Sequence, residues 1–306
     1  MQRKAVLITG AHRSGTTWVG KVCALSPGVG YMHEPFNVLY PNCSCGASFD
    51  RWFTYIHAGN EPLYVKHFDH LFQWRYSFFS RIVKARSWDH VLKVAKHSTS
   101  HAWYKMGQKR IIMKDPIALF SVEWLYRNFN TQPVIMIRHP AAFAYSLIRK
   151  NWHFPFQDLV HQTALMEDYL SSFADEISGA VDSPGTILDQ ACLIWKLFYH
   201  VVTIYRHRHP DWLCVRHEDI SNDPDSYFRD IFSSLNLTWS AAVSRAISSS
   251  TSEQNVIMPS QARESLKRAS KSNIKYWKKC FTQSEQKMIR QKTEAIATTY
   301  YGDADW

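Results

Sequence analysis

Short apolar runs alternate with stretches of helical periodicity along this chain. Four runs, each too short for a core helix, predict buried β-strands over residues 4–9, 110–114, 133–138 and 212–216. Helices are predicted over residues 16–25, 141–150, 157–178, 186–208, 224–235, 240–248 and 285–300. The last of these has Thr282 as its expected N-cap, with Glu285 at the spacing of a capping box. Strands that alternate with helices predict an α/β fold, in which a mostly parallel sheet carries helices on both faces.

Residues 40–105 break this alternation, because they are irregular and rich in Tyr, Trp, Phe and His. We expect an aromatic-rich helical insertion there that contributes to a ligand pocket. The chain has no internal repeat and no linker composition, so a single domain over residues 1–306 is predicted.

Composition excludes several classes of protein. Hydrophobic residues make up 45% of the chain and charged residues 20%, which excludes a disordered chain. No run of 18 apolar residues occurs, so no transmembrane helix is expected. The six cysteines are scattered, and the one close pair, Cys43 and Cys45, lacks the second pair of a zinc site. We therefore expect no metal and a reduced, cytoplasmic setting.

The charge is strongly basic, with a net value of +10. Ten Lys or Arg lie between Arg263 and Lys292, against the two acidic residues Glu264 and Glu285. This concentration of cations late in the chain is typical of a surface that binds phosphate.

The clearest motif is a glycine loop, Gly10-Ala-His-Arg-Ser-Gly-Thr-Thr17, between the first strand and the first helix. Backbone amides in such a turn form an anion cradle at the N-terminus of the helix, so a P-loop-like sheet is predicted. Thr16 follows Gly15 where a Walker-type ATPase or kinase has lysine, which argues against a nucleoside-triphosphate enzyme. The cation of this loop is Arg13 instead.

Cations also end two other predicted strands. Lys114, which is followed by Asp115, ends the second strand, and Arg138 ends the third. Because ligands of such sheets bind beyond the carboxyl ends of the strands, these residues should share one edge with the glycine loop. Ser146 lies eight residues after Arg138, about two turns along the next helix, so arginine and hydroxyl can converge on one phosphate.

These motifs resemble those of sulfotransferases that use 3'-phosphoadenosine 5'-phosphosulfate (PAPS). Arg13-Ser-Gly-Thr-Thr-Trp18 matches the family's first motif, and Arg138 with Ser146 matches its second. The resemblance implies that Arg13, Ser14, Gly15, Thr16 and Thr17 hold the 5'-phosphosulfate, with Arg13 also acting in catalysis. It further implies that Trp18 stacks on adenine and that Arg138 and Ser146 hold the 3'-phosphate.

Two further resemblances are looser. Residues 270–282 resemble the family's late basic segment, which implies that Lys271 and Ser272 contact the donor, although Ser270, Ser272 and Lys275 depart from the pattern. Tyr31-Met-His-Glu-Pro-Phe36 resembles the Glu-Pro segment of the carbohydrate and bacterial branches, to which Arg13 also points.

The resemblance to those branches implies Glu34 as the general base, and His33 and Asp115 are the alternatives. We expect a neighbouring phosphosulfate to raise the pKa of the Glu34 carboxyl. Lys114 is expected to contact the sulfonate or the bridging oxygen, unless it forms an ordinary salt bridge with Asp115.

The predicted function is therefore transfer of a sulfonate from PAPS to a hydroxyl or amine, with adenosine 3',5'-bisphosphate (PAP) as product. The acceptor is left open between a glycan and a small molecule such as a hydroxylated alkaloid. A small-molecule kinase is the first alternative, and a non-enzymatic binder of nucleic acid or a heparin-like polymer is the second. The aligned motifs favour the enzyme, with no nucleic acid as partner.

Overall fold

The computed structural model describes residues 4–39, 46–75, 99–252 and 270–306, which include a five-stranded parallel sheet. The strand order is β2-β3-β1-β4-β5, and each neighbouring pair is parallel. The strands are β1 (Ala5–Gly10), β2 (Val29–His33), β3 (Arg110–Lys114), β4 (Thr131–Ile137) and β5 (Leu213–Arg216). Four of them confirm the strands predicted from the apolar runs.

The edge strand β2 was not predicted from the sequence. Its exposure alternates along the strand, with Gly30 and Met32 buried and His33 exposed. Gly30 lies against two aromatic rings, where a Cβ atom would approach Trp74 to 2.6 Å and Tyr104 to 2.8 Å. A short strand interrupted by a glycine gives a weak sequence signal, since its pattern depends on partners that are distant in the chain.

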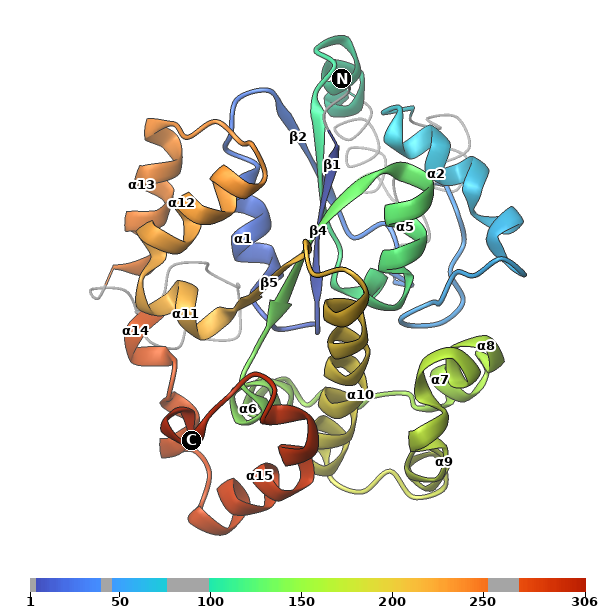
Figure 1. The fold of residues 1–306 in the computed structure, drawn as a ribbon, viewed down its shortest axis with the longest axis vertical. Helices are drawn as coiled ribbons and strands as arrows, with labels where there is room; N and C mark the ends of the chain where they lie inside the picture. Colours follow the sequence, from blue (N-terminus) through green and yellow to red (C-terminus); the bar gives the residue numbers. More distant parts are fainter. Residues whose placement is uncertain (1–3, 40–45, 76–98, 253–269) are drawn as a thin grey trace, which may run out of the picture.

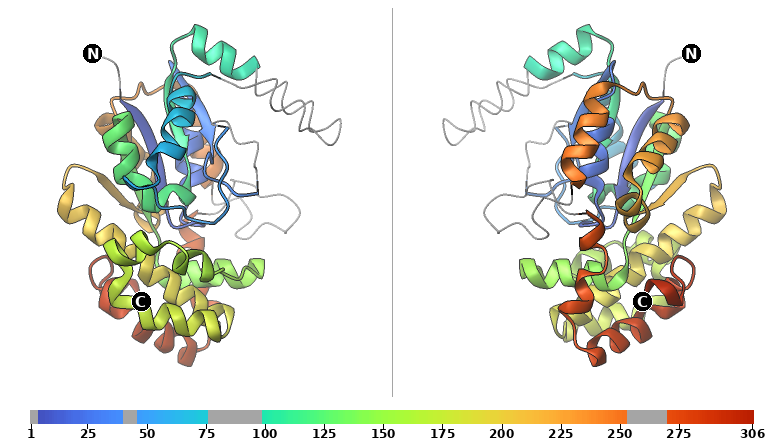
Figure 2. Two further views of the ribbon diagram at one scale, coloured as in Figure 1. Left: turned by 90° about the vertical axis from the view of Figure 1, so that its right-hand side faces the viewer. Right: turned by 90° about the vertical axis from the view of Figure 1, so that its left-hand side faces the viewer.

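Helices cover both faces of the sheet, as predicted (Figures 1 and 2), and alternate strand residues pack against the two layers. Val6 and Ile8 belong to the core on one face, and Leu7 belongs to the core on the other. The first face is covered by α1 (Thr16–Cys23), α11 (His217–Asn222), α12 (Pro224–Ser234) and α13 (Ala241–Thr251). The second is covered by α2 (Val65–Phe72), α5 (Val122–Phe129) and α10 (Ile187–Arg208).

A group of helices lies beyond the carboxyl edge of the sheet, at the bottom of Figure 1. It consists of α6 (Pro140–Lys150), α7 (Gln157–Val160), α8 (Thr163–Leu165), α9 (Ala174–Asp182), α15 (Gln283–Ala297) and the first half of α10. The predicted capping box of α15 is confirmed, with Thr282 and Glu285 bonded reciprocally. The continuous helix predicted over 157–178 is wrong, because it is divided into α7, α8, short helical turns and the start of α9.

Helix α10 is the one helix within the described ranges that is long and apolar enough to cross a membrane. However, 67% of its most apolar window is buried inside the fold. Its apolar character is therefore that of a core helix.

The described parts of the 40–105 insertion contribute mainly to the core. Phe49, Phe53, Tyr64, Phe68 and Trp74 are all buried in the cluster that covers one face of the sheet. These aromatic side chains stabilise the fold, so their enrichment is not by itself a sign of a ligand pocket. Residues 40–45 and 76–98 of the insertion lie outside the described residues.

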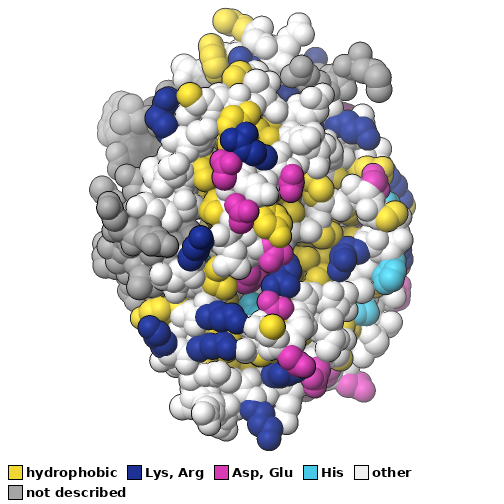
Figure 3. All heavy atoms as spheres, turned by 60° about the vertical axis from the view of Figure 1, so that its left-hand side comes forward, with side chains coloured by type: hydrophobic (Ala, Val, Ile, Leu, Met, Phe, Trp, Pro, Cys, Tyr) yellow, Lys and Arg dark blue, Asp and Glu magenta, His cyan; other side chains and the backbone are white. Residues whose placement is uncertain are grey.

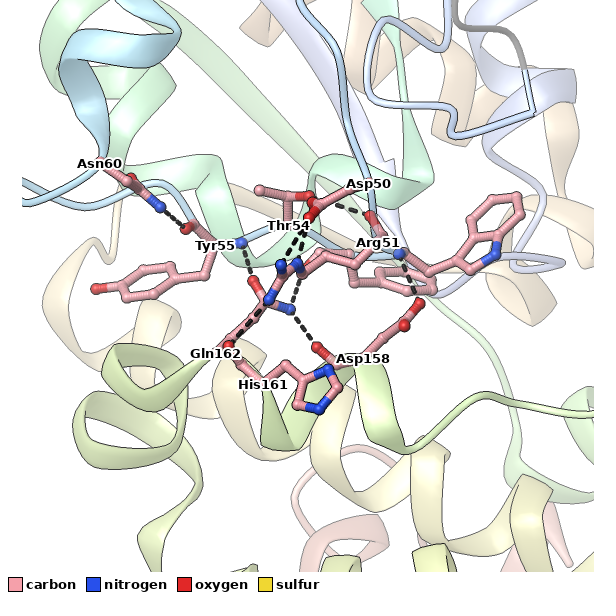
Figure 4. A network of polar contacts seen from close by, with 10 residues as sticks. Asp50, Arg51, Thr54, Tyr55, Asn60, Asp158, His161 and Gln162 are labelled. Atoms are coloured by element: carbon pink, nitrogen blue, oxygen red, sulfur yellow. Dashed lines mark hydrogen bonds and ion pairs between the residues drawn. The ribbon is translucent and has the colours of Figure 1, made fainter.

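A network of polar contacts fastens residues 51–55 of the insertion to α7 and to the two residues that follow it (Figure 4). Asp158 accepts a hydrogen bond from the Trp52 amide at 2.9 Å, and Gln162 accepts one from the Tyr55 amide at 2.7 Å. Arg51 donates to the His161 carbonyl at 2.9 Å. This anchoring holds Phe53, whose φ is 55°, among the aromatic rings beneath the carboxyl edge.

The tight start of the glycine loop gives a stability prediction. Gly10 has φ 135°, and a Cβ atom there would lie 2.3 Å from the Met136 carbonyl oxygen of β4. We expect Gly10→Ala to lower the free energy of unfolding by roughly 2–5 kcal/mol, because it adds overpacking to backbone strain. Gly28 is the matched control, since it has φ 82° and nothing within 4 Å of the added carbon. Equal losses for the two variants in urea denaturation would contradict this packing role of Gly10.

Candidate active site

The glycine loop lies where the sequence predicts it, between β1 and α1 at the carboxyl edge of the sheet. Gly15 has φ 94° and approaches the His217 ring so closely that a Cβ atom would lie 2.5 Å from its Cδ2. The Ser14 hydroxyl donates to the Ala11 carbonyl at 2.5 Å. Thr16 then begins α1, so the N-terminus of this helix faces the loop. The backbone has the arrangement that binds an anion.

Two motifs that are distant in the sequence meet at this loop. Arg13 Nε donates a hydrogen bond to Ser146 Oγ at 3.0 Å, across 133 positions of the chain. The Arg138 guanidinium donates to the Arg13 carbonyl oxygen. The structure thus brings together the cation of the loop, the arginine that follows β4 and the serine of α6.

Helix α10 fixes the backbone of Arg138. The Tyr199 hydroxyl accepts from the Arg138 amide at 2.9 Å, and the Trp195 indole donates to the Arg138 carbonyl at 2.8 Å. Because the amide and the carbonyl of Arg138 are both hydrogen-bonded, its guanidinium extends from a fixed backbone position. Neither contact could be predicted from the sequence, where Tyr199 and Trp195 belong to an ordinary apolar helix pattern.

A small pocket opens beside these residues, between α6 and the late basic segment. It is lined by Arg138, Ala142, Tyr145, Ser146, Arg149, Asn273, Tyr276 and Trp277. The late segment therefore contributes Asn273, Tyr276 and Trp277 to this pocket. Lys271 and Ser272 are both exposed on α14 (Ser270–Asn273) and do not line the pocket.

Several of the predicted cations contact other groups of the protein, while Arg263, Lys267 and Arg268 lie outside the described residues. Lys275 donates to the Ala304 carbonyl at 2.7 Å, and Lys278 donates to the Trp306 carbonyl. Lys292 pairs with Asp189 on α10 at 2.5 Å. Lys and Arg side chains are spread over the face seen in Figure 3 with carboxylates between them, rather than gathered into one patch.

Trp18 is mostly buried between α1 and the helices that cover the same face of the sheet. Its indole donates to Ser250 Oγ at 3.0 Å, and its ring packs edge to face on Phe228 at 5.2 Å. The side chain is 9% exposed, so little of the ring is open for the expected stacking on adenine.

Glu34 and Lys114 form an ion pair at the carboxyl ends of β2 and β3. The second oxygen of Glu34 accepts from Asn37 Nδ2 at 2.6 Å, and His33 Nε2 lies 3.9 Å from it. The Lys114 side chain is 1% exposed, and that of Glu34 is 16% exposed. A buried ammonium therefore has its counter-charge in Glu34, and the alternative pairing of Lys114 with Asp115 is wrong.

This pairing changes the electrostatics expected of Glu34. Burial by itself raises the pKa of the carboxyl, but the Lys114 charge and the hydrogen bonds from Lys114 and Asn37 lower it below the ordinary value of 4.5. The protein alone thus keeps Glu34 ionised at neutral pH, whereas the sequence argument expected a neighbouring phosphosulfate to raise its pKa.

The two alternative bases are placed differently. Asp115 is fully buried and accepts from the amides of Phe36 at 2.7 Å and Ile117 at 3.0 Å. Burial raises the pKa of Asp115 to about 8. Asp115 caps a helical turn and ties the Glu34 turn to β3, while the His33 side chain is 51% exposed beside Glu34.

His12 is a residue of the loop that the sequence analysis did not single out. Its ring lies among Phe53, Phe143, Phe198 and Trp152, with centroid distances of 5.2–6.1 Å. Desolvation, followed by the charge of Arg13, lowers the pKa of His12 to about 3, so the ring is neutral. Nothing in the local sequence indicates that His12 is buried among aromatic rings, because these rings come from three segments that are distant in the chain.

Among the residues that the structure describes, no three His, Cys, Asp or Glu side chains are grouped as a metal site. Cys43 and Cys45, the closest pair in the sequence, lie outside the described residues. Cys23, Cys192, Cys214 and Cys280 are free thiols.

The glycine loop, the parallel sheet and the cations of β3 and β4 define an α/β protein with a phosphate-loop architecture. The sequence pattern of the sulfotransferase family matches residues 5–241, which contain the loop, Glu34, Lys114, Arg138 and Ser146. The chain therefore belongs to the sulfotransferase family, as its motifs predicted. A search of curated protein sequences finds no match.

Solved structures with a similar fold are sulfotransferase domains. The domain from the Synechococcus PCC 7002 olefin synthase has a TM-score of 0.51 at 14% identity, over 98% of this chain and 95% of that one. The domain from the curacin biosynthetic pathway has a TM-score of 0.48 at 13% identity, over 95% and 97%. STF1 from Mycobacterium tuberculosis H37Rv has a TM-score of 0.44 at 15% identity, over 96% and 77%. The first of these likenesses supports the fold, which is the predicted one.

Proposed function

We propose that this sulfotransferase uses PAPS as its donor and transfers the sulfonate to a hydroxyl or amine of a small molecule or glycan. The observation that carries the proposal is that Arg13 of the glycine loop is hydrogen-bonded to both Ser146 and Arg138, and that Ser146 and Arg138 line one pocket. Two guanidinium groups and a hydroxyl at one place suit a ligand with two separate anionic groups. PAPS is such a ligand, with a 5'-phosphosulfate and a 3'-phosphate.

The chain's own groups divide the work of donor binding. The amides of Ser14 to Thr17 and the Arg13 side chain would hold the 5'-phosphosulfate at the N-terminus of α1. Arg138 and Ser146 would hold the 3'-phosphate. Lys271 and Ser272 stay predicted donor contacts from exposed positions on α14.

The reaction needs a base and a stabilised leaving group. Glu34 is ionised at neutral pH, and it would accept the proton of the acceptor as the acceptor oxygen or nitrogen bonds to sulfur. The bond between sulfur and the bridging oxygen breaks, and PAP leaves with the electron pair. Lys114 and Arg13 would stabilise the charge that develops on the bridging oxygen. This chemistry takes its cations from side chains and calls for no metal.

The acceptor is proposed at the level of its reactive group. His12 is neutral and surrounded by aromatic rings, and Trp152 beside it is 44% exposed and lies over the Arg13 guanidinium at 5.5 Å. An exposed tryptophan beside Arg13 suits either a sugar ring or a flat metabolite as the acceptor. A kinase activity has no such support, because Thr16 replaces the lysine that holds a triphosphate.

We also propose that the protein works in a reducing, cytoplasmic setting.

The direct test is transfer of label from [35S]PAPS to panels of phenols, alkaloid alcohols and oligosaccharides. We expect labelled product with at least one panel and stoichiometric PAP, without added Mg²⁺. The matched reaction contains γ-labelled ATP and Mg²⁺. Transfer from ATP and none from PAPS would refute the proposed donor.

A further inference from the structure

His139, the residue after Arg138, also has its backbone amide hydrogen-bonded to a side chain of another element. The His139 amide donates to Glu218 Oε1 at 3.0 Å, and Glu218 comes from α11, directly after β5. The Glu218 carboxyl is buried, and its other oxygen accepts from the Tyr301 hydroxyl at 3.0 Å. The turn between β4 and α6 is thus tied to the helix that follows the neighbouring edge strand β5 and to the end of the chain.

The His139 ring is enclosed on the same side. It stacks on Trp277 with centroids 4.8 Å apart, and the rings of Tyr301 and Trp306 meet it edge to face at 4.9 and 4.5 Å. Trp277 also lines the pocket beside Arg138 and Ser146. The Glu218 contacts therefore fix both the backbone next to Arg138 and, through Tyr301, one of the rings that enclose His139.

We propose that Glu218 is a positioning residue, which sets Arg138 for the 3'-phosphate of the donor by holding the His139 amide and the Tyr301 hydroxyl. This inference rests on the proposed donor. A displacement of the Arg138–His139 turn by less than 1 Å would misalign a charged hydrogen bond whose strength depends on geometry. Glu218 does not line the pocket, so its effect on ligand binding passes through the turn and through its charge interaction with Arg138.

Glu123 on α5 is the matched control, and it lies at the C-terminal end of α10. Glu123 accepts a hydrogen bond from the Tyr169 hydroxyl, as Glu218 does from Tyr301, and Arg208 and His209 also contact it. This second Tyr–Glu pair is partly buried and touches none of the residues that line the pocket at Arg138. Its loss should destabilise the fold without changing nucleotide selectivity.

The experiment measures the ratio of the AMP and PAP dissociation constants for the full chain by calorimetry. We expect Glu218→Ala to lower this ratio at least about tenfold, the size of one misaligned charged hydrogen bond, with AMP affinity unchanged within about threefold. Glu218→Gln should keep a near-normal ratio, because its amide oxygen can still accept from the His139 amide and its NH₂ can donate to Tyr301. Glu123→Ala should keep the wild-type ratio.

A wild-type ratio near one would refute the proposed donor. Two other results would overturn the positioning role of Glu218 but not the proposed donor. In the first, the wild-type protein prefers PAP and Glu218→Ala keeps that preference. In the second, Glu123→Ala loses the preference as much as Glu218→Ala does. If Glu218→Ala does not fold, Tyr301→Phe decides, with Tyr169→Phe as its control. We expect a fall in the ratio of about threefold for Tyr301→Phe only, and an unchanged ratio would overturn the inference.

Discussion

Replacing Arg138 with alanine should weaken the binding of PAP by about 2–4 kcal/mol, which is roughly 30- to 1000-fold. Arg138 follows β4, and its guanidinium reaches the Arg13 carbonyl beside Ser146. Because the ligand at this point is proposed to be the 3'-phosphate, the loss should be confined to ligands that carry it. Binding of AMP should change by less than about threefold. Isothermal titration calorimetry with both nucleotides measures the difference.

The fold should survive this substitution, since the Arg138 backbone keeps its bonds to Tyr199 and Trp195. Arg229→Ala is the control for removal of a cation, because Arg229 lies on α12 and its exposed side chain pairs with Asp225 at 2.8 Å. An Arg138→Ala protein that is folded and binds PAP normally would remove Arg138 from the donor site.

The second large effect is expected at Glu34. Gln retains the shape of the side chain and its hydrogen-bonding reach but cannot accept the proton of the acceptor. We expect kcat of Glu34→Gln to fall by about 10²- to 10⁴-fold, the range for loss of a general base, with PAP affinity nearly intact. Steady-state kinetics with an acceptor found in the labelling screen measures the change.

Glu34 also neutralises the buried Lys114 ammonium, so a loss of stability has to be separated from a loss of catalysis. Thermal unfolding of each variant supplies that separation. The double variant Glu34→Gln with Lys114→Met also removes the unpaired charge, and it should regain stability while staying inactive. Near-normal turnover in Glu34→Gln, beside an inactive His33→Ala or Asp115→Asn, would transfer the role of base.

The lowered pKa of Glu34 fixes the direction of the pH dependence. A base must be deprotonated, and this carboxyl stays deprotonated until the pH falls below its ordinary value of 4.5. We therefore expect kcat/KM, which reports the free enzyme, to stay level from pH 7 down to about 5. If the pKa of Glu34 were raised instead, kcat/KM would begin to fall nearer to neutral pH.

The sequence predicted the parts of this protein whose signals are local. The apolar runs that became β1, β3 and β4 are buried over almost their whole length, so their signal did not depend on a partner. The run that became the edge strand β5 is only partly buried. The loop from Gly10 to Thr17 follows from its place between a strand and a helix. The resemblance to the sulfotransferase family pointed to the pair Arg138 and Ser146, and the strand end and the helix explain why these two side chains lie close together.

What could not be predicted depends on contacts between distant segments. Lys114 pairs with Glu34 rather than with its neighbour Asp115 because β2 lies beside β3, and β2 itself was missed. Lys275 and Lys278 bind the end of the chain and Lys292 pairs with Asp189 on α10, which a count of charges cannot show. The aromatic residues before α2 fill the core, and an enrichment in Phe and Trp does not distinguish a core from a pocket.

The central claim is that this sulfotransferase binds a donor with a 3'-phosphate, and the melting temperature with PAP and with AMP tests it most directly. A ligand that binds the folded protein raises the melting temperature according to its affinity and concentration. At equal, saturating concentrations we predict a much larger rise with PAP, because only PAP can use Arg138 and Ser146. Equal shifts with the two nucleotides, or none with either, would contradict the assignment of PAPS as the donor.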